Sequence, residues 1–177
     1  MPRFELDVKP VSHITTDALG KPGERVFYLQ GGQNERIITL LVEKIQIQSL
    51  AVGVEQFLTE IAQKYPDLPE ASADFTESRM HIYPPVDPLF RVGEMGLGYD
   101  ADNDLMVLVA REAVPEGEET SEEAGVVRFW CTRSQVRALC HWGVELANRG
   151  RPICPQCGEP MDPEGHFCPK KNGHKKD

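Results

Sequence analysis

The chain has 177 residues, a formal net charge of −9 and five cysteines, and 40% of its residues are hydrophobic. A chain of this length has room for one core of ordinary size and a small appendage, because domains are typically about 100–150 residues long. The hydrophobic share is too high for a wholly disordered chain, and no apolar run approaches the ~20 residues that span a bilayer. The composition therefore predicts a soluble globular protein.

The sequence also favours a reducing, intracellular compartment. The first residues, MPRFELDVKP, carry four charged side chains and lack the apolar stretch of a secretory signal peptide. An odd number of cysteines fits free thiols and metal ligands better than a framework of disulfide bonds. We therefore expect a cytoplasmic protein that does not associate with membranes.

Most of the acidity lies in the body of the chain. Residues 1–149 hold 14 Lys and Arg against 24 Asp and Glu, whereas residues 150–177 hold 5 against 4. Six glutamates fall within residues 112–123, a stretch that predicts a mobile, solvated loop between two strands, with attraction of a basic partner as the alternative role. Lys and Arg do not cluster as a duplex-binding face requires, so nucleic acid is not an expected partner.

In the first half, the pattern predicts a β-meander followed by a helix. Extended segments are predicted at 4–8, 11–18, 25–30 and 36–42, with a hairpin turn at 31–35. After Glu43, apolar residues recur at helical spacing and predict a helix of about 18–20 residues that ends before Pro66. These residues are Leu50, Val54, Phe57, Leu58, Ile61 and Tyr65.

The second half repeats this plan after a proline-rich connection. Five prolines within residues 66–88 predict a linker or a long surface crossing. Strands are predicted at 90–100, 105–111 and 126–131, and Ser134 is the predicted N-cap of a helix that ends at Gly150.

The predicted fold class is α+β, built from two β-meander-plus-helix units with a C-terminal zinc knuckle or ribbon. The halves, at about 1–66 and 89–149, form one body, and residues 150–177 form the zinc knuckle and a basic tail. Residues 40–51 align weakly with residues 129–140. We favour a duplication over a chance likeness between two strand-helix junctions.

Duplicated meander-helix units also occur in some single-stranded nucleic-acid-binding proteins, and residues 26–65 loosely resemble one such unit of the Pur-alpha type. These proteins need a positively charged sheet with exposed aromatic side chains. The predicted strands offer Phe27, Tyr28, Phe129 and Trp130. Strand alternation sends about half of them into the core, so core packing is their favoured role.

The C-terminal segment carries the most specific chemical signal, a set of closely spaced metal-ligating residues. Cys154 and Cys157 stand in C-P-Q-C-G, a knuckle that turns both sulfurs toward one point. His166 and Cys168 follow, and as residues i and i+2 of an extended segment they project to the same side. Together these residues predict a zinc site of three cysteines and one histidine, with His174 as the alternative to His166.

A closed shell of four ligands leaves no coordination position for water or substrate, so the expected zinc is structural. The segment has few apolar residues, which favours a fold that depends on the metal. A redox role for C-P-Q-C-G is disfavoured, because the following prolines exclude the long helix of a thioredoxin-like motif. The other thiols, Cys131 and Cys140, fall on a strand and on a helix face, where we expect buried core residues.

Other catalytic motifs are scarce. The sequence contains no nucleophile elbow, P-loop, dinucleotide fingerprint or H-E-x-x-H. His13, His81 and His141 are isolated, which favours ordinary surface or packed histidines over a general base. The glycine-rich residues 92–98 lie in a strand pattern and predict bulges or close backbone packing.

Four segments carry a family resemblance: GKPGERVFYLQ (20–30), VEKIQIQSLA (42–51), FRVGEMGLGYDADNDLMVLVA (90–110) and GRPICPQCGEPMDPEGHFCPKKNG (150–173). In this order they resemble a bacterial family of uncharacterised proteins known only as a domain of unknown function. The family's C-terminal pattern resembles C-P-x-C-G and then G-H-x-C-P, often with an aromatic residue in the place of His174. The resemblance implies Cys154, Cys157, His166 and Cys168 as ligands. Members tend to be encoded near a histidine-phosphatase-like and a lipid-kinase-like protein, which implies a phosphorylation-linked pathway but no specific reaction.

Three functions are open on the sequence alone. The favoured one is a binding or adaptor module for a protein partner with a structural zinc, because catalytic constellations are scarce. The second is an enzyme or enzyme subunit with a site between the two halves, built from groups such as Arg25, Glu43, Lys44 and Arg133. The third is single-stranded nucleic-acid binding. The sequence predicts no oligomeric state.

Overall fold

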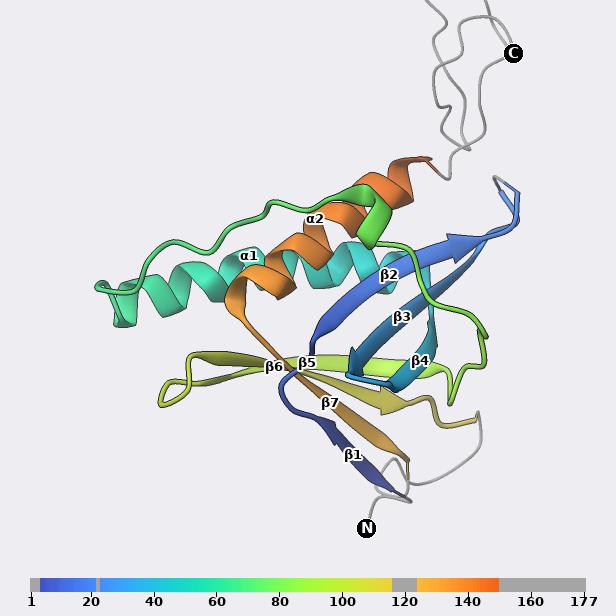
Figure 1. Ribbon diagram of the computed structural model, residues 1–177, viewed down its shortest axis with the longest axis horizontal. Helices are drawn as coiled ribbons and strands as arrows, with labels where there is room; N and C mark the ends of the chain where they lie inside the picture. Colours follow the sequence, from blue (N-terminus) through green and yellow to red (C-terminus); the bar gives the residue numbers. More distant parts are fainter. Residues whose placement is uncertain (1–3, 22, 116–123, 150–177) are drawn as a thin grey trace, which may run out of the picture.

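The computed structural model describes residues 4–21, 23–115 and 124–149 (Figure 1). These residues form two β-sheets and two long helices, which confirms the predicted α+β class. The predicted zinc knuckle and most of the predicted acidic loop lie outside the described residues. Within the described part of the chain, no helix is both long and apolar enough to cross a membrane.

The first sheet has three antiparallel strands. They are β2 (His13–Leu19), β3 (Val26–Gln33) and β4 (Arg36–Val42), in that order, and helix α1 (Lys44–Lys64) follows directly. Three of the four extended segments predicted for the first half thus form this meander, and the helix follows as predicted. The fourth segment, at 4–8, was wrongly assigned to this half, because it pairs with a strand of the other sheet.

Strand β3 is longer than predicted, because Gly31 and Gly32 belong to the strand and not to the turn. A Cβ atom on Gly31 would lie 2.5 Å from the Phe129 ring, and one on Gly32 would lie 2.6 Å from the His13 ring. Glycine therefore lets two rings pack directly on the strand backbone. The chain reverses instead around Asn34, which has a positive φ of 56°.

The second sheet has four strands in the order β1-β7-β6-β5. β5 (Val92–Asp100), β6 (Leu105–Glu112) and β7 (Val126–Cys131) form an antiparallel meander, and helix α2 (Arg133–Arg149) follows. Strand β1 (Glu5–Val8), from the start of the chain, pairs in parallel with β7. Each half thus has three meander strands and a helix in the predicted order, while a common origin of the halves stays a prediction.

Helix α2 begins with a different cap from the one predicted. Thr132, not Ser134, precedes the helix, and its hydroxyl accepts a hydrogen bond from the Gln135 amide at 3.0 Å. The Gln135 side chain accepts one from the Thr132 amide at 2.8 Å, which completes a capping box. Ser134 accepts a hydrogen bond from the Ser72 amide instead. The predicted cap is wrong because the T-x-x-Q box starts two residues before Ser134.

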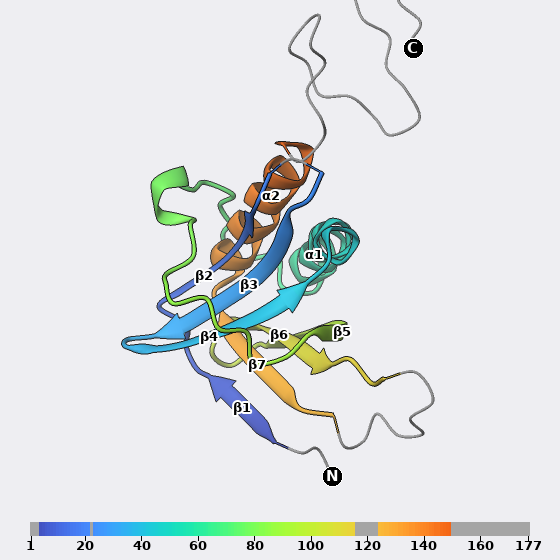
Figure 2. The same cartoon turned by 90° about the vertical axis from the view of Figure 1, so that its right-hand side faces the viewer.

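Helices α1 and α2 lie side by side, and α2 packs on the sheet of the other half (Figure 1, Figure 2). The Trp142 indole donates a hydrogen bond to the Thr16 carbonyl of β2 at 2.7 Å. A Cβ atom on Gly143 would lie 2.6 Å from Ile47 of α1, so this glycine sets a close approach of the helices. The two halves therefore share one core, whose almost fully buried members include Leu29, Ile47, Leu108, Phe129 and Trp142.

The proline-rich connection, which contains a short 3-10 helix (Glu77–Arg79), crosses the outer face of the first sheet and covers a row of polar side chains. These are Thr15, Asp17, Gln30 and Thr39, which are at most 6% exposed. Gln30 exchanges two hydrogen bonds with the Tyr83 backbone, at 2.9 and 3.1 Å, and Asp17 accepts one from the Ile82 amide. Because these buried groups find partners, the connection is a packed part of the body.

Candidate functional site

The predicted zinc ligands Cys154, Cys157, His166 and Cys168, and the alternative ligand His174, lie outside the described residues. In the ranges that the structure describes, no group of three or more His, Cys, Asp or Glu side chains could hold a metal ion. The zinc site therefore stays a prediction.

The two thiols of the body are buried, as predicted. Cys131 of β7 and Cys140 of α2 are 0% and 2% exposed. Burial raises the pKa of the Cys140 thiol to about 12 and also raises the pKa of Cys131 above its usual value. Buried, protonated thiols are poor nucleophiles and poor metal ligands. Of the five cysteines, only the three in residues 150–177 are therefore candidate metal ligands.

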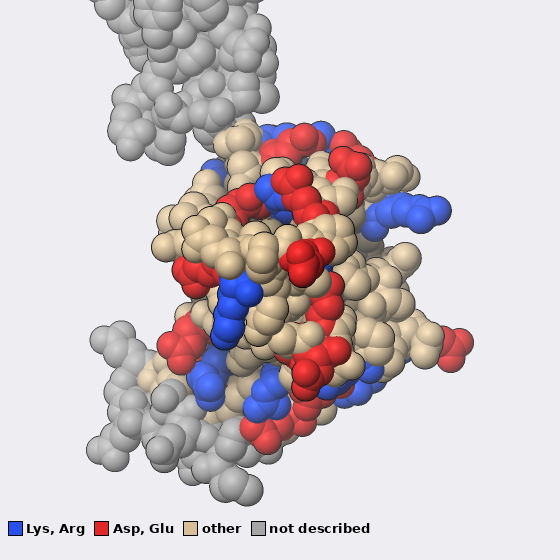
Figure 3. Space-filling model, turned by 90° about the vertical axis from the view of Figure 1, so that its left-hand side faces the viewer, with Lys and Arg blue, Asp and Glu red and all other residues tan. Residues whose placement is uncertain are grey.

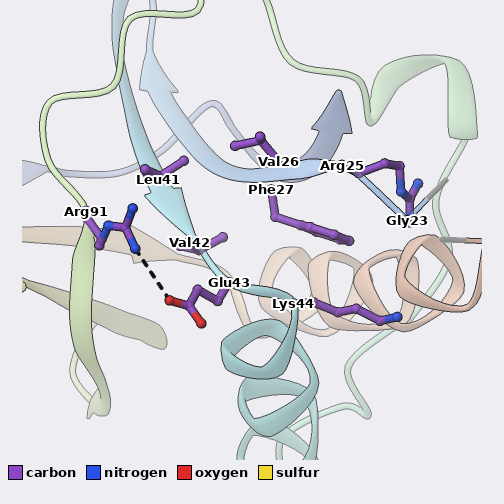
Figure 4. A pocket seen from close by; sticks show the side chains of 9 residues that line it. All are labelled: Gly23, Arg25, Val26, Phe27, Leu41, Val42, Glu43, Lys44 and Arg91. Atoms are coloured by element: carbon purple, nitrogen blue, oxygen red, sulfur yellow. Dashed lines mark ion pairs between the residues drawn. The ribbon is translucent and has the colours of Figure 1, made fainter. Parts of the chain in front are cut away.

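A pocket of about 430 Å³ opens at the N-terminus of α1 (Figure 4). Its apolar lining comes from the start of β3 and the end of β4, and its charged lining consists of Arg25, Glu43, Lys44 and Arg91. The volume falls within the range of about 300–1,000 Å³ that is usual for small-molecule sites. Three of the four groups predicted for a site between the halves line this pocket.

Strand pairing brings the pocket residues together. Phe27 of β3 pairs with Val42 of β4, so the residues that flank these strands, Arg25 and Lys44, come to the same end of the sheet. Arg91 arrives from the second half through a parallel bridge to Leu41. The sequence did not predict Arg91 as a pocket residue, because no local pattern indicates a contact between Leu41 and Arg91, which lie 50 residues apart.

Lys44 is the first residue of α1, and its side chain makes no hydrogen bond or ion pair with another described residue. The N-terminus of a helix carries a partial positive charge, so a lysine here is electrostatically unfavourable. The preceding Glu43 is the N-cap and forms a capping box with Gln46, so its carboxylate lies at this helix terminus and also 3.6 Å from the Arg91 guanidinium. No acidic residue lies within the first turn itself. Lys44 therefore adds to a positive potential that an anion would neutralise.

Arg25 and Lys44 extend on either side of the Phe27 ring (Figure 4). Arg25 donates one hydrogen bond to the Leu146 carbonyl at 2.6 Å, and its buried Nε has no partner among the described residues. Burial lowers the pKa of Arg25, while Asp17 opposes and Arg149 reinforces this effect. An arginine stays charged nonetheless. Its guanidinium carbon lies 5.1 Å from the centroid of the Phe27 ring, and no carboxylate of a described residue forms an ion pair with it, so it is a second cation at the pocket.

The pocket thus collects three cations and one carboxylate in a chain whose formal net charge is −9. A local excess of positive charge on an acidic protein attracts small anions. The described residues that line the pocket include no Ser, Thr, Cys or His, so they offer no ordinary nucleophile. The arrangement is suited to binding an anion that also carries an apolar group.

Arg133, the fourth group predicted for this site, lies elsewhere. Its guanidinium donates to both carboxylate oxygens of Asp104, at 2.8 and 3.1 Å, and to the Pro69 carbonyl. The Tyr99 hydroxyl also donates to Asp104 at 2.7 Å, and burial together with Asp104 raises the pKa of Tyr99 to about 12. This cluster joins the start of α2, the β5-β6 turn and the connection, which is a structural role.

The histidines of the body have separate partners. His81 Nδ1 lies 3.1 Å from an Asp17 oxygen, and His141 Nε2 lies 3.3 Å from a Glu55 oxygen. The His13 ring packs edge-on against a tyrosine ring at 5.0 Å, and burial lowers the pKa of His13. Each is a surface or packed residue, and none faces the pocket at α1.

The aromatic side chains proposed for a nucleic-acid-binding sheet are divided between core and surface. Phe27 and Phe129 are 6% and 0% exposed. Tyr28 shares the face crossed by the connection, and the Trp130 indole donates to the Asp7 carboxylate at 2.9 Å. On the face shown in Figure 3, acidic and basic side chains are interspersed and form no basic stripe. These surroundings disfavour single-stranded nucleic acid as a ligand.

The comparison with known proteins identifies a family. Residues 6–168 match the family model described as "Protein of unknown function (DUF3090)". No curated protein and no solved structure matches the chain. The match takes in both helices and nearly all of both sheets, and it includes the four favoured zinc ligands but not His174. The chain therefore belongs to the DUF3090 family of proteins of unknown function.

Proposed function

We propose that the protein binds a small anionic ligand in the pocket at the N-terminus of α1. The observation that carries this proposal is Lys44, a cation at the start of a helix with no partner among the described residues. A lysine at this position is unfavourable beside the helix dipole. The Glu43 carboxylate caps the helix and pairs with Arg91, so it forms no ion pair with Lys44, and local rules are typically broken at functional sites. Arg25 and Arg91 supply two more cations to the same pocket.

A phosphate ester with an aromatic or aliphatic group is the ligand class that this pocket favours. Phosphate oxygens accept several charge-assisted hydrogen bonds, which suits guanidinium and ammonium donors. Helix N-termini bind phosphate through their free amides. Val26, Phe27 and Val42 offer apolar contact beside the cations, so they favour an ester over inorganic phosphate.

We propose in addition that residues 150–177 bind one structural zinc ion. Thiolates and imidazole are ligands that zinc prefers, and Cys154, Cys157, His166 and Cys168 supply three of the first and one of the second. His174 is the alternative fourth ligand. Zinc bound there would stabilise the segment, and it is not required for the anion pocket.

Calorimetric titration with phenyl phosphate tests the anion pocket. We expect Lys44→Gln to weaken binding about tenfold, because the variant loses one charge-assisted hydrogen bond to the ligand. The variant should not lower Tm, because it removes a positive charge from the positive end of the helix dipole. Lys64→Gln is the matched control, since it removes the same charge from the other end of α1. Equal affinities for the wild type and Lys44→Gln, or equal losses in both variants, would contradict the proposal.

Zinc content measured on purified full-length protein tests the metal site. We expect one zinc per chain in the wild type and in His174→Ala, and loss of zinc in Cys154→Ser and His166→Ala. Full zinc content in Cys154→Ser would refute the site. If His174→Ala loses zinc and His166→Ala keeps it, the fourth ligand is His174 and not His166.

A further inference from the structure

Strand β5 is an open edge of the second sheet. It is nine residues long, and among the described strands it pairs with β6 alone. From Glu94 to Asp100, no hydrogen bond from another described element reaches the backbone of its outer edge. An open edge presents a row of unpaired N–H and C=O groups, which proteins usually cover or shorten. The length of this uncovered edge therefore calls for an explanation.

Helix α1 runs beside β5 (Figure 2). Three cavities are each lined by residues of both elements. One of about 320 Å³ lies between the first turns of α1 and residues 93–97. Two more, of about 300 and 330 Å³, continue past the end of α1 to Tyr99 and Ala101. The three cavities follow one another along β5, and we call them together the β5 groove.

The walls of the β5 groove are mainly apolar beside Gly96, where two glycines leave open space. Ile45 is 61% exposed at one end, and the rings of Tyr65 and Tyr99 lie 5.8 Å apart at the other. A Cβ atom on Gly53 of α1 or on Gly96 of β5 would have no neighbour within 4 Å. Both positions therefore have room for a side chain that the sequence does not supply.

The rim of the β5 groove is mainly acidic. Glu60, Asp67 and Glu94 lie along it, against Lys64 as the cation among the described lining residues. Glu94 is partly offset by Arg111 at 3.4 Å, whereas Glu60 has no ion pair with a described residue. A ligand of this groove is therefore expected to carry basic side chains.

We propose that the β5 groove binds an extended, basic segment of a partner protein, which adds to β5 as a further strand. Strand addition of this kind gains affinity from backbone hydrogen bonds and specificity from alternate side chains. Here the alternate apolar side chains enter the cavities beside α1, and flanking Lys or Arg residues meet the rim carboxylates. The groove is separate from the anion pocket, and neither proposal depends on the other.

The test starts with selection of random 12-residue peptides on the full-length protein. We expect enrichment of peptides that alternate apolar residues and carry Lys or Arg. A synthetic copy of one such peptide should slow hydrogen exchange of backbone amides between Glu94 and Asp100. Gly96→Val and Gly53→Leu should each weaken its binding at least tenfold while Tm is preserved, because both side chains enter open space. Val144→Phe, on the exposed face of α2, is the control and should bind normally.

Several results would overturn the proposal. They are the absence of any enriched peptide, or enriched peptides that bind Gly96→Val and Gly53→Leu as well as the wild type. Amides of β5 that are already protected without peptide would show that the edge is occupied by the chain itself. A dimer in size-exclusion chromatography that Gly96→Val dissociates would assign the groove to a second copy.

Discussion

At the scale of single residues, two arginines make the same paired contact with a carboxylate in different surroundings. Arg133 pairs with Asp104, and 11% of the Arg133 side chain is exposed. Arg149 pairs with Glu77, and 46% of the Arg149 side chain is exposed. Both pairs have two N–H donors within hydrogen-bonding distance of the carboxylate. Removing one partner of a buried pair leaves an uncompensated charge, whereas an exposed pair is screened by water.

We therefore expect Arg133→Met to destabilise the protein by about 2 kcal/mol in urea unfolding. This is less than the ~3–5 kcal/mol of fully buried pairs, because Asp104 is 41% exposed. Glu77→Gln, which breaks the exposed pair, should leave the unfolding midpoint close to that of the wild type. A larger loss in Glu77→Gln than in Arg133→Met would contradict a structural role for the buried cluster.

Glu55 of α1 should make stability depend on pH through its pairing with Arg137 of α2. Two hydrogen bonds of 2.9 Å from Arg137 hold the pKa of Glu55 below its ordinary value of 4.5, against the opposing effect of burial. A carboxyl group whose pKa falls on folding stabilises the folded state above the unfolded pKa. That contribution is lost as the pH falls through the folded pKa.

Glu55→Gln should therefore lower Tm at pH 7, and the difference from the wild type should shrink as the pH falls from about 5 to 3. Thermal melts at pH 7, 5, 4 and 3 measure this. Glu60→Gln, an exposed position of the same helix, should follow the wild type throughout. A difference in Tm that stays constant over this range would exclude the pairing as its cause.

At the scale of elements, the contact between the two helices depends on Gly143. Its position in the middle of α2 is unfavourable for helix propensity, since glycine costs about 1 kcal/mol relative to alanine. A Cβ atom there would nevertheless lie 2.6 Å from the branched side chain of Ile47 and 3.3 Å from Thr16. Gly53, in the middle of α1, has no such neighbour.

The two glycines should therefore respond in opposite directions to the same substitution. We expect Gly143→Ala to destabilise the protein by about 1–3 kcal/mol through overpacking. Gly53→Ala should stabilise it by about 0.5–1 kcal/mol through helix propensity. Urea unfolding of both variants measures the difference, and stabilisation by Gly143→Ala would show that the helices are not held at this distance.

The elements that could be predicted are those with a strong local pattern. Helical spacing placed α1 and α2, and alternation placed the strands of both meanders. The end of β3 was predicted wrongly because distant groups decide it: Gly31 and Gly32 continue the strand, and two rings from other strands fill their side-chain space. The cap of α2 was predicted wrongly although its signal is local, because Gln135 completes a capping box with Thr132 and not with Ser134.

At the scale of the whole molecule, the unpredicted features are contacts between segments far apart in sequence. β1 pairs in parallel with β7 across more than 100 residues. The connection supplies the hydrogen-bond partners of the buried Gln30 and Asp17 side chains. Its proline-rich sequence predicts a linker or surface crossing and does not indicate this packing role. The same kind of contact brings Arg91 to the pocket that holds Arg25 and Lys44, although those two residues were among the groups predicted for a site.

In this acidic protein, the cationic pocket at the start of α1 is proposed to bind a small anion. The ¹H–¹⁵N spectrum of the protein during titration with phenyl phosphate tests this binding at the level of single residues. We expect the largest saturable shifts on the amides of residues 25–27 and 43–46 and on Arg91, and we expect higher ionic strength to weaken binding. Saturable shifts that fall elsewhere, or no shifts at millimolar phenyl phosphate, would contradict this proposal.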